Sequence, residues 1–92
     1  MLKIEYHGQF KRDYKRAVKR GCDISKLTKV ITLLANEQPL PPHYKDHALT
    51  DSGKYKDVRE CHIQPDWLLV YHISDQRLIL TLIRTGSHSD LF

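Results

Sequence analysis

The stretch "WLLVYHISDQRLILTLIRT", residues 67–85, decides the fold of this 92-residue chain. It contains two apolar runs, residues 67–73 and 78–85, separated by the polar sequence "SDQR". Short runs that are rich in leucine, isoleucine and valine and are bounded by turn residues are typical of buried β-strands. We therefore predict two antiparallel strands at the centre of a sheet.

A third strand precedes this pair. Residues 54–63, "KYKDVRECHI", alternate so that Cys61 and Ile63 share one face. The opposite face then carries Val58, Glu60 and His62. The sequence "QPD" supplies a tight turn into the first apolar run, so the three strands should form an antiparallel meander.

The first half of the chain shows helical spacing. A helix that stops at Gly21 is predicted by apolar residues at i, i+4, i+7 and i+8, namely Phe10, Tyr14, Ala17 and Val18. Asp23 is a plausible N-cap for a second helix, whose apolar stripe ends before "NEQP" and comprises Ile24, Leu27, Val30, Ile31 and Leu34. The short loop between them predicts two antiparallel helices.

These elements predict an α+β fold in a single domain, residues 1–92. A short strand at residues 2–6 comes first, the helical pair covers one face of the sheet, and a short C-terminal tail follows the meander. Residues 39–54 contain three prolines, a glycine and few apolar positions, so we expect a loop there. A loop of this length in a small domain is usually functional or mobile.

The charge is concentrated in the first half of the chain. Residues 1–45 hold ten lysines and arginines against four acidic residues, whereas residues 46–92 hold five against seven. A polyanionic partner would explain this imbalance. No stretch approaches the roughly 20 apolar residues of a membrane span, and the first residues lack the apolar region of a signal peptide, so we expect a cytoplasmic protein. Cys22 and Cys61 are expected to be free thiols.

Ionisable residues gather at the strand ends of the second half. Three of them are histidines, His47 before the meander, His62 near the end of its first strand, and His88 after its last strand. Asp66 lies in the first turn and Arg84 closes the last strand. Because a meander brings strand ends together, these groups are expected to share one surface.

This combination suits cleavage of RNA, whose own 2′-hydroxyl can serve as the nucleophile. Imidazoles with pKa values of about 6.5 can act as base or acid near neutral pH. An arginine fork matches the oxygens of a phosphate, and Trp67 and Phe92 could stack on bases. The same histidines and aspartate are also competent zinc ligands. His43 and His47 have helical i, i+4 spacing, but the proline-rich segment around them disfavours a helix.

Three strings of sequence strengthen the nuclease interpretation. "KDHAL" at residues 45–49, "RECHIQPDWLLVY" at 59–71 and "RTGSHSDLF" at 84–92 together resemble the YafQ toxins of the RelE-like superfamily. The similarity covers essentially the whole chain and implies a RelE-like microbial RNase-type fold.

The resemblance also implies roles for particular residues. The family's functional histidines fall on His47, His62 and His88, and its aspartate falls on Asp66. Its substrate-binding positions fall on Trp67, Arg84 and Phe92, with Glu60 as a supporting candidate. The preferred assignment makes His88 the general acid and His47 the general base, with Asp66 and His62 as positioning groups.

The activity implied is that of an mRNA interferase, the toxin of a type II toxin–antitoxin system. It would cut messenger RNA in the A site of the 70S ribosome without a metal or other cofactor, until a cognate antitoxin covers it. Operator DNA would be bound only through the antitoxin complex, and no membrane is involved. Lys11, Lys15 and Arg16 are candidate contacts to ribosomal RNA. The alternatives are a non-catalytic RNA- or DNA-binding module and an inactive co-repressor that acts with its antitoxin.

Overall fold

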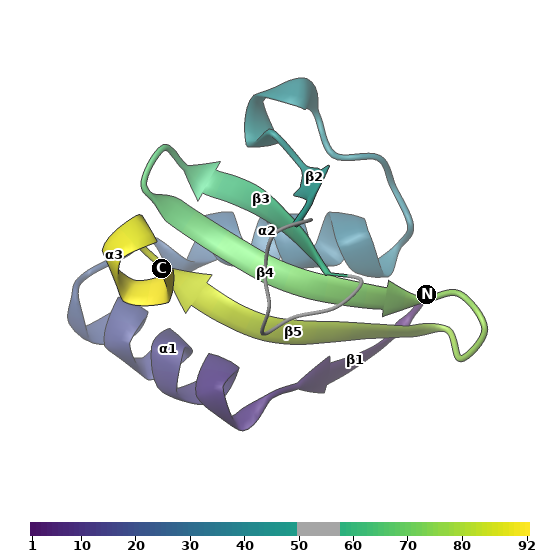
Figure 1. Ribbon diagram of the computed structural model, residues 1–92, viewed down its shortest axis with the longest axis horizontal. Coiled ribbons are helices and arrows are strands. Elements are labelled where there is room, and N and C mark those ends of the chain that lie inside the picture. The colour runs from purple at the N-terminus through teal and green to yellow at the C-terminus, as the bar shows by residue number, and fades with distance from the viewer. Residues whose placement is uncertain (50–57) are drawn as a thin grey trace.

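The computed structural model describes residues 1–49 and 58–92. Its elements follow the chain as β1 (Lys3–Tyr6), α1 (Gly8–Lys19), α2 (Ile24–Ala35), the 3₁₀-helix η1 (Pro42–Tyr44), β2 (His47–Ala48), β3 (Arg59–Gln64), β4 (Trp67–Ser74), β5 (Ile79–Gly86) and α3 (His88–Leu91). Figure 1 shows one twisted sheet with α1 and α2 behind it. The predicted α+β class is confirmed.

The sheet has five strands in the order β1-β5-β4-β3-β2. β3, β4 and β5 form the predicted antiparallel meander, and β1 adds to the far side of β5 in parallel. The apolar runs form the strands nearest the centre, where Leu69, Tyr71 and Leu82 are fully buried. A register shift between Val70 and Tyr71 marks a bulge against β5.

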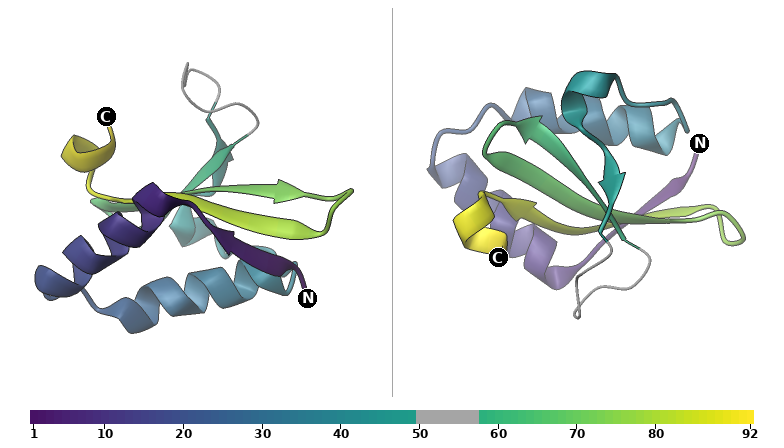
Figure 2. Two further views of the ribbon diagram at one scale, coloured as in Figure 1. Left: turned by 90° about the horizontal axis from the view of Figure 1, so that it is seen from below. Right: turned by 45° about the horizontal axis from the view of Figure 1, so that its top comes forward.

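Both long helices lie on one face of the sheet, and α3 lies on the other (Figure 2). α1 ends as predicted at Gly21, whose φ of 78° allows a Schellman motif. In this motif the Gly21 N–H donates to the Val18 carbonyl and the Cys22 N–H donates to the Ala17 carbonyl, each at 3.1 Å. Among the described residues, no helix is long and apolar enough to cross a membrane.

The predicted apolar face of α1 is partly wrong. Tyr14 and Val18 are exposed, and the buried residues are Phe10, Asp13 and Ala17. An aspartate can take an inward position only where donors satisfy its carboxylate, and Asp13 accepts two hydrogen bonds from Arg84 on β5.

The prediction for α2 is confirmed. The Asp23 side chain caps the helix by accepting from the Ser25 N–H at 3.1 Å. Leu27, Val30 and Leu34 are buried against the sheet. The stripe of apolar residues therefore faces the core, as its spacing indicated.

The expected loop at residues 39–54 is more ordered than predicted. It contains η1 and the two-residue strand β2, which pairs antiparallel with β3. His47 therefore lies on a strand rather than before one. The rest of the predicted loop, residues 50–54, lies outside the described residues.

The C-terminal tail is likewise not a plain extension, because it forms the single-turn helix α3. Ser87 and Asp90 form a capping box in which each side chain accepts from the other residue's backbone N–H. Asp90 also accepts two hydrogen bonds from Arg20 of α1, at 2.6 and 3.1 Å. Gly86 permits the close approach of this turn, since a Cβ there would lie 2.9 Å from the Asp90 side chain. Leu91 packs on Val58, Val70 and Ile83.

Candidate functional site

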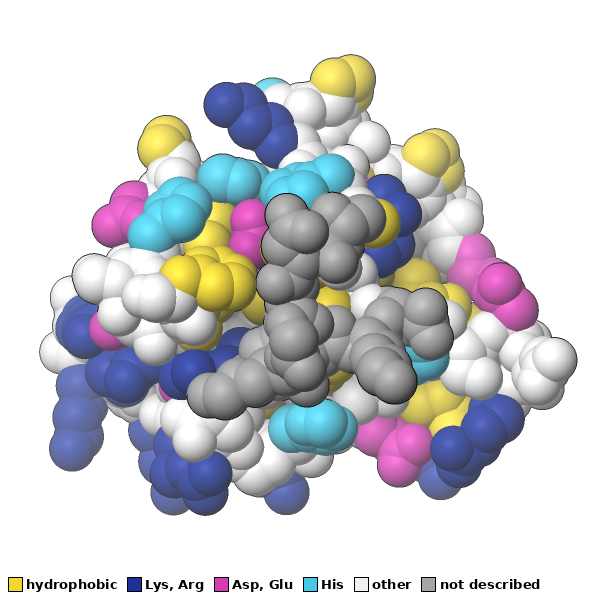
Figure 3. Space-filling view, viewed as in Figure 1, with side chains coloured by type: hydrophobic (Ala, Val, Ile, Leu, Met, Phe, Trp, Pro, Cys, Tyr) yellow, Lys and Arg dark blue, Asp and Glu magenta, His cyan; other side chains and the backbone are white. Residues whose placement is uncertain are grey.

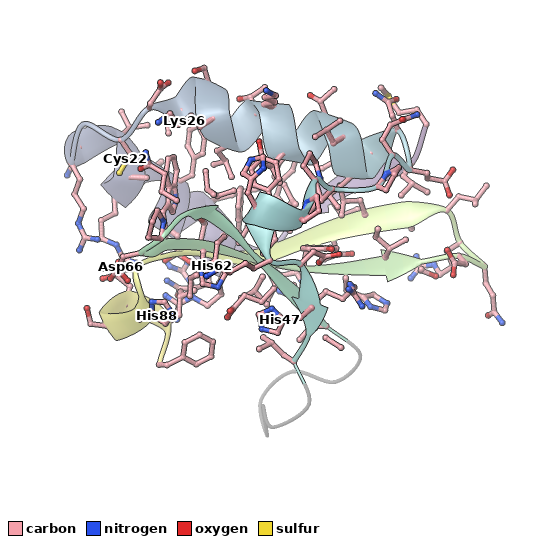
Figure 4. The ribbon with its side chains drawn as sticks, turned by 90° about the horizontal axis from the view of Figure 1, so that it is seen from above. Cys22, Lys26, His47, His62, Asp66 and His88 are labelled. Carbon is pink, nitrogen blue, oxygen red and sulfur yellow. The ribbon has the colours of Figure 1, made fainter. Side chains whose placement is uncertain are left out.

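Three histidines meet on the face of the sheet that α1 and α2 leave uncovered. His47 comes from β2, His62 from β3, and His88 from the first position of α3. The His62 ring centroid lies 6.3 Å from that of His47 and 5.8 Å from that of His88. Figure 3 shows histidine side chains gathered on this surface, and Figure 4 shows the labelled rings on the side of the sheet opposite α2. The expected clustering of these residues is therefore present.

Glu60 lies between two of the rings. Its buried carboxylate places Oε1 3.5 Å from Nε2 of His47 and 3.7 Å from Nε2 of His62. The backbone register explains the contact, because His47 pairs directly with Glu60 across β2 and β3. An ionised Glu60 would stabilise a positive charge on either ring.

Asp66 is joined to His88 by two hydrogen bonds. Asp66 Oδ1 accepts from the His88 backbone N–H at 3.0 Å and lies 2.8 Å from His88 Nδ1. These bonds lower the pKa of Asp66, first through the backbone N–H and then through the ring. The carboxylate is therefore ionised at neutral pH and holds the His88 ring by its Nδ1–H.

All three rings direct Nδ1 at an oxygen acceptor. His47 Nδ1 lies 2.7 Å from the Lys45 carbonyl, and His62 Nδ1 lies 3.4 Å from the Pro65 carbonyl. A carbonyl oxygen can only accept, so Nδ1 carries the proton in both rings. In each neutral ring Nε2 is therefore the nitrogen that can accept a proton.

Asp46 supports His47 and was not found from the sequence. Its carboxylate accepts two hydrogen bonds from Arg59, at 3.2 and 3.0 Å, and one from the Tyr71 hydroxyl at 2.5 Å. Burial, followed by this hydrogen bond, raises the pKa of Tyr71. These contacts fasten the start of β2 to β3 and β4, and so fix the residue next to His47. A two-residue strand has too little pattern to reveal such an anchor.

Trp67 does not present a stacking surface beside the histidines. Its side chain belongs to the core under α1 and α2, and the residue is 5% exposed. The indole Nε1 donates to Thr85 Oγ1 at 2.9 Å. The indole therefore does not lie beside the histidines, because alternation along β4 places it on the same face as Leu69 and Tyr71, and its stacking on bases stays a prediction.

The Arg84 guanidinium, which was expected to bind a phosphate, is hydrogen-bonded to a side chain of the protein. The register places Arg84 in the same row of the sheet as Val70, Glu60 and His47, but its guanidinium is tied to Asp13 by two hydrogen bonds of 3.0 Å. Asp13 is 1% exposed. Burial alone would raise the pKa of Asp13, but hydrogen bonds from Arg84, Gln9 and the Thr85 N–H lower it. A phosphate would have to compete with Asp13 for Arg84.

The remaining candidates lie at the surface. Phe92 is 64% exposed, and its backbone N–H donates to the His88 carbonyl at 2.8 Å, so its ring is available for stacking. Lys11 and Lys15 are exposed on α1. Arg16, the third expected ribosome contact, instead donates to Asp13 at 3.0 Å and lies 3.9 Å from Asp90.

The described residues do not form a metal site. Across residues 1–49 and 58–92, no group of three or more histidine, cysteine, aspartate or glutamate side chains is arranged to hold a metal ion. Cys61 lies on the opposite, core-facing side of β3, where burial raises the pKa of its thiol to about 12.

Comparison with known proteins places this fold and surface among small bacterial toxins. A metal-bound toxin from Helicobacter pylori is 54% identical in sequence and superimposes with a TM-score of 0.91 over 100% of both chains. The toxin in the Escherichia coli DinJ-YafQ complex is 45% identical, with a TM-score of 0.89 over 100% of this chain and 99% of that one. The mRNA interferase toxin YafQ of Escherichia coli K12 is 47% identical over 90 residues, which cover 97% of this chain and 94% of the relative.

The family follows from the sequence match. Residues 2–92 match the model of YafQ, a bacterial toxin of type II toxin–antitoxin systems. The chain therefore belongs to the YafQ toxin family, which confirms the resemblance drawn from its three sequence strings.

Proposed function

We propose that this protein is an mRNA interferase, an endoribonuclease that cuts messenger RNA in the A site of the 70S ribosome by metal-independent acid–base catalysis. The observation that carries the proposal is the set of three imidazoles with oriented Nδ1 atoms on one exposed face of the sheet. The relatives support it, because the Escherichia coli homologue is named an mRNA interferase toxin.

The proposed reaction uses the RNA's own 2′-hydroxyl. A base takes the hydroxyl proton while the 2′-oxygen bonds to the adjacent phosphorus, and the bond from phosphorus to the 5′-oxygen breaks. An acid delivers a proton to the departing 5′-oxygen, which leaves a 2′,3′-cyclic phosphate on one product. The protein must therefore provide one neutral and one protonated group on opposite sides of the phosphate.

The hydrogen-bond partners favour His88 as the acid and His47 as the base. His88 Nδ1 faces an ionised carboxylate, which stabilises the imidazolium form that an acid requires. His47 Nδ1 faces the neutral Lys45 carbonyl, which leaves Nε2 as a proton acceptor. Glu60 would then stabilise the charge that His47 gains, and His62 lies between the two rings.

The remaining surface residues would bind the substrate and the ribosome. The exposed Phe92 ring is suited to stacking on a splayed base. The exposed Lys11 and Lys15 would contact ribosomal RNA, with an affinity that weakens as salt rises. A cognate antitoxin would inhibit the toxin, as the Escherichia coli DinJ-YafQ complex suggests by analogy. Operator DNA would be reached only through that complex.

The test is cleavage of a ribosome-bound message by wild-type protein and by His88→Ala, both with a chelator present. The wild type should remain active, and loss of the general acid should slow cleavage by about 10²–10⁴-fold. His7→Ala is a matched control, because His7 is exposed and its side chain makes no capping bond to α1. Wild-type activity that disappears with the chelator, or full activity of His88→Ala, would contradict the mechanism.

A non-catalytic nucleic-acid-binding role is the alternative. Mapping messenger ends in cells that express the protein separates the two, since an interferase produces new ends and a binding module or co-repressor leaves messages intact.

A further inference from the structure

A pocket of about 400 Å³ opens at the end of the sheet, beside the histidine cluster but on the helix side. It lies between the second half of α1 and the β3–β4 turn, and Ala17 and the edge of Trp67 form apolar parts of its wall. Figure 4 shows Cys22 and Asp66, which both line it, at the same end of the molecule. Its volume falls within the range of roughly 300–1,000 Å³ typical of ligand pockets.

Asp66 connects this pocket to the proposed catalytic surface. The same side chain that holds His88 at 2.8 Å lines the pocket. An RNA strand whose scissile phosphate lies at His88 would therefore bring a neighbouring nucleotide to the pocket.

The polar groups of the pocket suit a nucleobase better than a second phosphate. Two arginines are balanced by two aspartates, so the lining has no net charge from these groups; they are Arg16, Arg20, Asp13 and Asp66. Arg16 and Arg20 are held by Asp13 and Asp90, which offers oriented guanidinium planes on which a base can stack.

Gln64 supplies a means of reading the base. It is exposed at the end of β3, it lines the pocket, and its amide forms no side-chain hydrogen bond with any part of the chain that the structure describes. An amide offers a donor and an acceptor together, which matches the edge of a base. We propose that this pocket binds the base of the nucleotide next to the scissile phosphate, and that Gln64 makes cleavage depend on its identity.

This inference rests on the proposed nuclease function, and the test separates the two. Cleavage is measured on ribosome-bound messages that differ by one nucleotide on either side of the cut. For Gln64→Ala, the ratio of cleavage rates between favoured and disfavoured messages should fall by about tenfold, because one base-reading contact is lost. Gln76→Ala, an exposed glutamine in the β4–β5 turn at the other end of the sheet, is the matched control and should keep the ratio.

Filling the pocket provides a second measurement. Cys22 is partly exposed and lines the pocket, whereas Cys61 is buried with a raised pKa, so a benzyl methanethiosulfonate reagent should modify Cys22 alone. Modification should slow cleavage at least about tenfold. Cys22→Ala treated identically should be unaffected, and a thermal melt of the modified protein confirms that it stays folded.

The outcomes distinguish failure of the nuclease function from failure of the base pocket. A wild type that cleaves no message overturns the nuclease function itself. Cleavage that survives modification of Cys22, with an unchanged ratio in Gln64→Ala, overturns only the base pocket. If modification weakens antitoxin binding and leaves cleavage intact, the pocket belongs to a protein partner and the proposal is likewise overturned.

Discussion

Two carboxylates in this protein contact nitrogen-bearing side chains at similar distances but in opposite surroundings. Asp66 and His88 lie 2.8 Å apart with side chains 69% and 57% exposed, whereas Asp13 and Arg84 lie 3.0 Å apart with side chains 0% and 15% exposed. Each pair joins segments that are distant in the chain. Burial, rather than contact distance, separates their roles.

The buried pair is suited to holding the fold. Asp13 receives hydrogen bonds from Arg84, Arg16, Gln9 and the Thr85 N–H, so it fastens α1 to the end of β5. Arginine keeps its charge at every ordinary pH, and the pair cannot exchange protons with a substrate. The exposed pair contains an imidazole, which can both accept and donate a proton, and it is accessible from solvent, as proton transfer requires.

The largest expected effect comes from breaking the buried pair. Asp13→Ala should lower the free energy of unfolding by about 3–5 kcal/mol, because it removes the buried carboxylate that accepts two hydrogen bonds from the charged Arg84 guanidinium. Urea denaturation measures the change. Asp75→Ala, an exposed aspartate in the β4–β5 turn, is the control and should change stability by less than about 0.5 kcal/mol. Equal losses in the two variants would show that the buried pair does not stabilise the fold.

Asp66→Asn should produce the opposite result, with little loss of stability and a large loss of cleavage. The pair is exposed, so screening by solvent should keep its contribution to the free energy of unfolding small. Without the carboxylate, the protonated His88 ring loses its stabilising charge, and cleavage should fall by about 10²-fold. Denaturation and cleavage assays on the same preparation check both parts. A stability loss as large as that of Asp13→Ala would erase the distinction between the pairs.

The sequence predicted that Asp66 and His88 would lie on one surface, but it did not predict the contact between Asp13 and Arg84. Asp66 and His88 stand at strand ends, where a meander predicts their meeting. Asp13 has no such signal, since only the folded sheet brings Arg84 next to it, across 71 residues of chain. The spacing of apolar residues alone predicted that Tyr14 faces the core, because spacing carries no information about the hydrogen-bond donors that a buried carboxylate needs.

The same limit explains why the burial of Trp67 was not predicted. An aromatic side chain can stack on bases, and the resemblance to the YafQ toxins gave Trp67 a substrate-binding role. Adjacent residues in a strand point to opposite faces, and the apolar alternation of Trp67, Leu69 and Tyr71 was a signal that could have placed the indole in the core. Sequence therefore predicted the strands well, while the partners of individual side chains depended on the tertiary structure.

The smallest expected effect is the response of each pair to acid. The folded-state pKa values of Asp13 and Asp66 are both lowered from the ordinary value of 3.8. Each ionised carboxylate therefore stabilises the fold at pH values above 3.8, and this contribution is lost as the pH falls through the folded-state pKa. The free energy of unfolding should thus decline below about pH 4. Asp13→Asn should flatten this decline more than Asp66→Asn, because the buried carboxylate is shielded less by water. Urea denaturation at several pH values gives the slope of the free energy of unfolding against pH for each variant. If Asp66→Asn flattened that slope more than Asp13→Asn, exposure would not weaken the electrostatic contribution of Asp66 to folding.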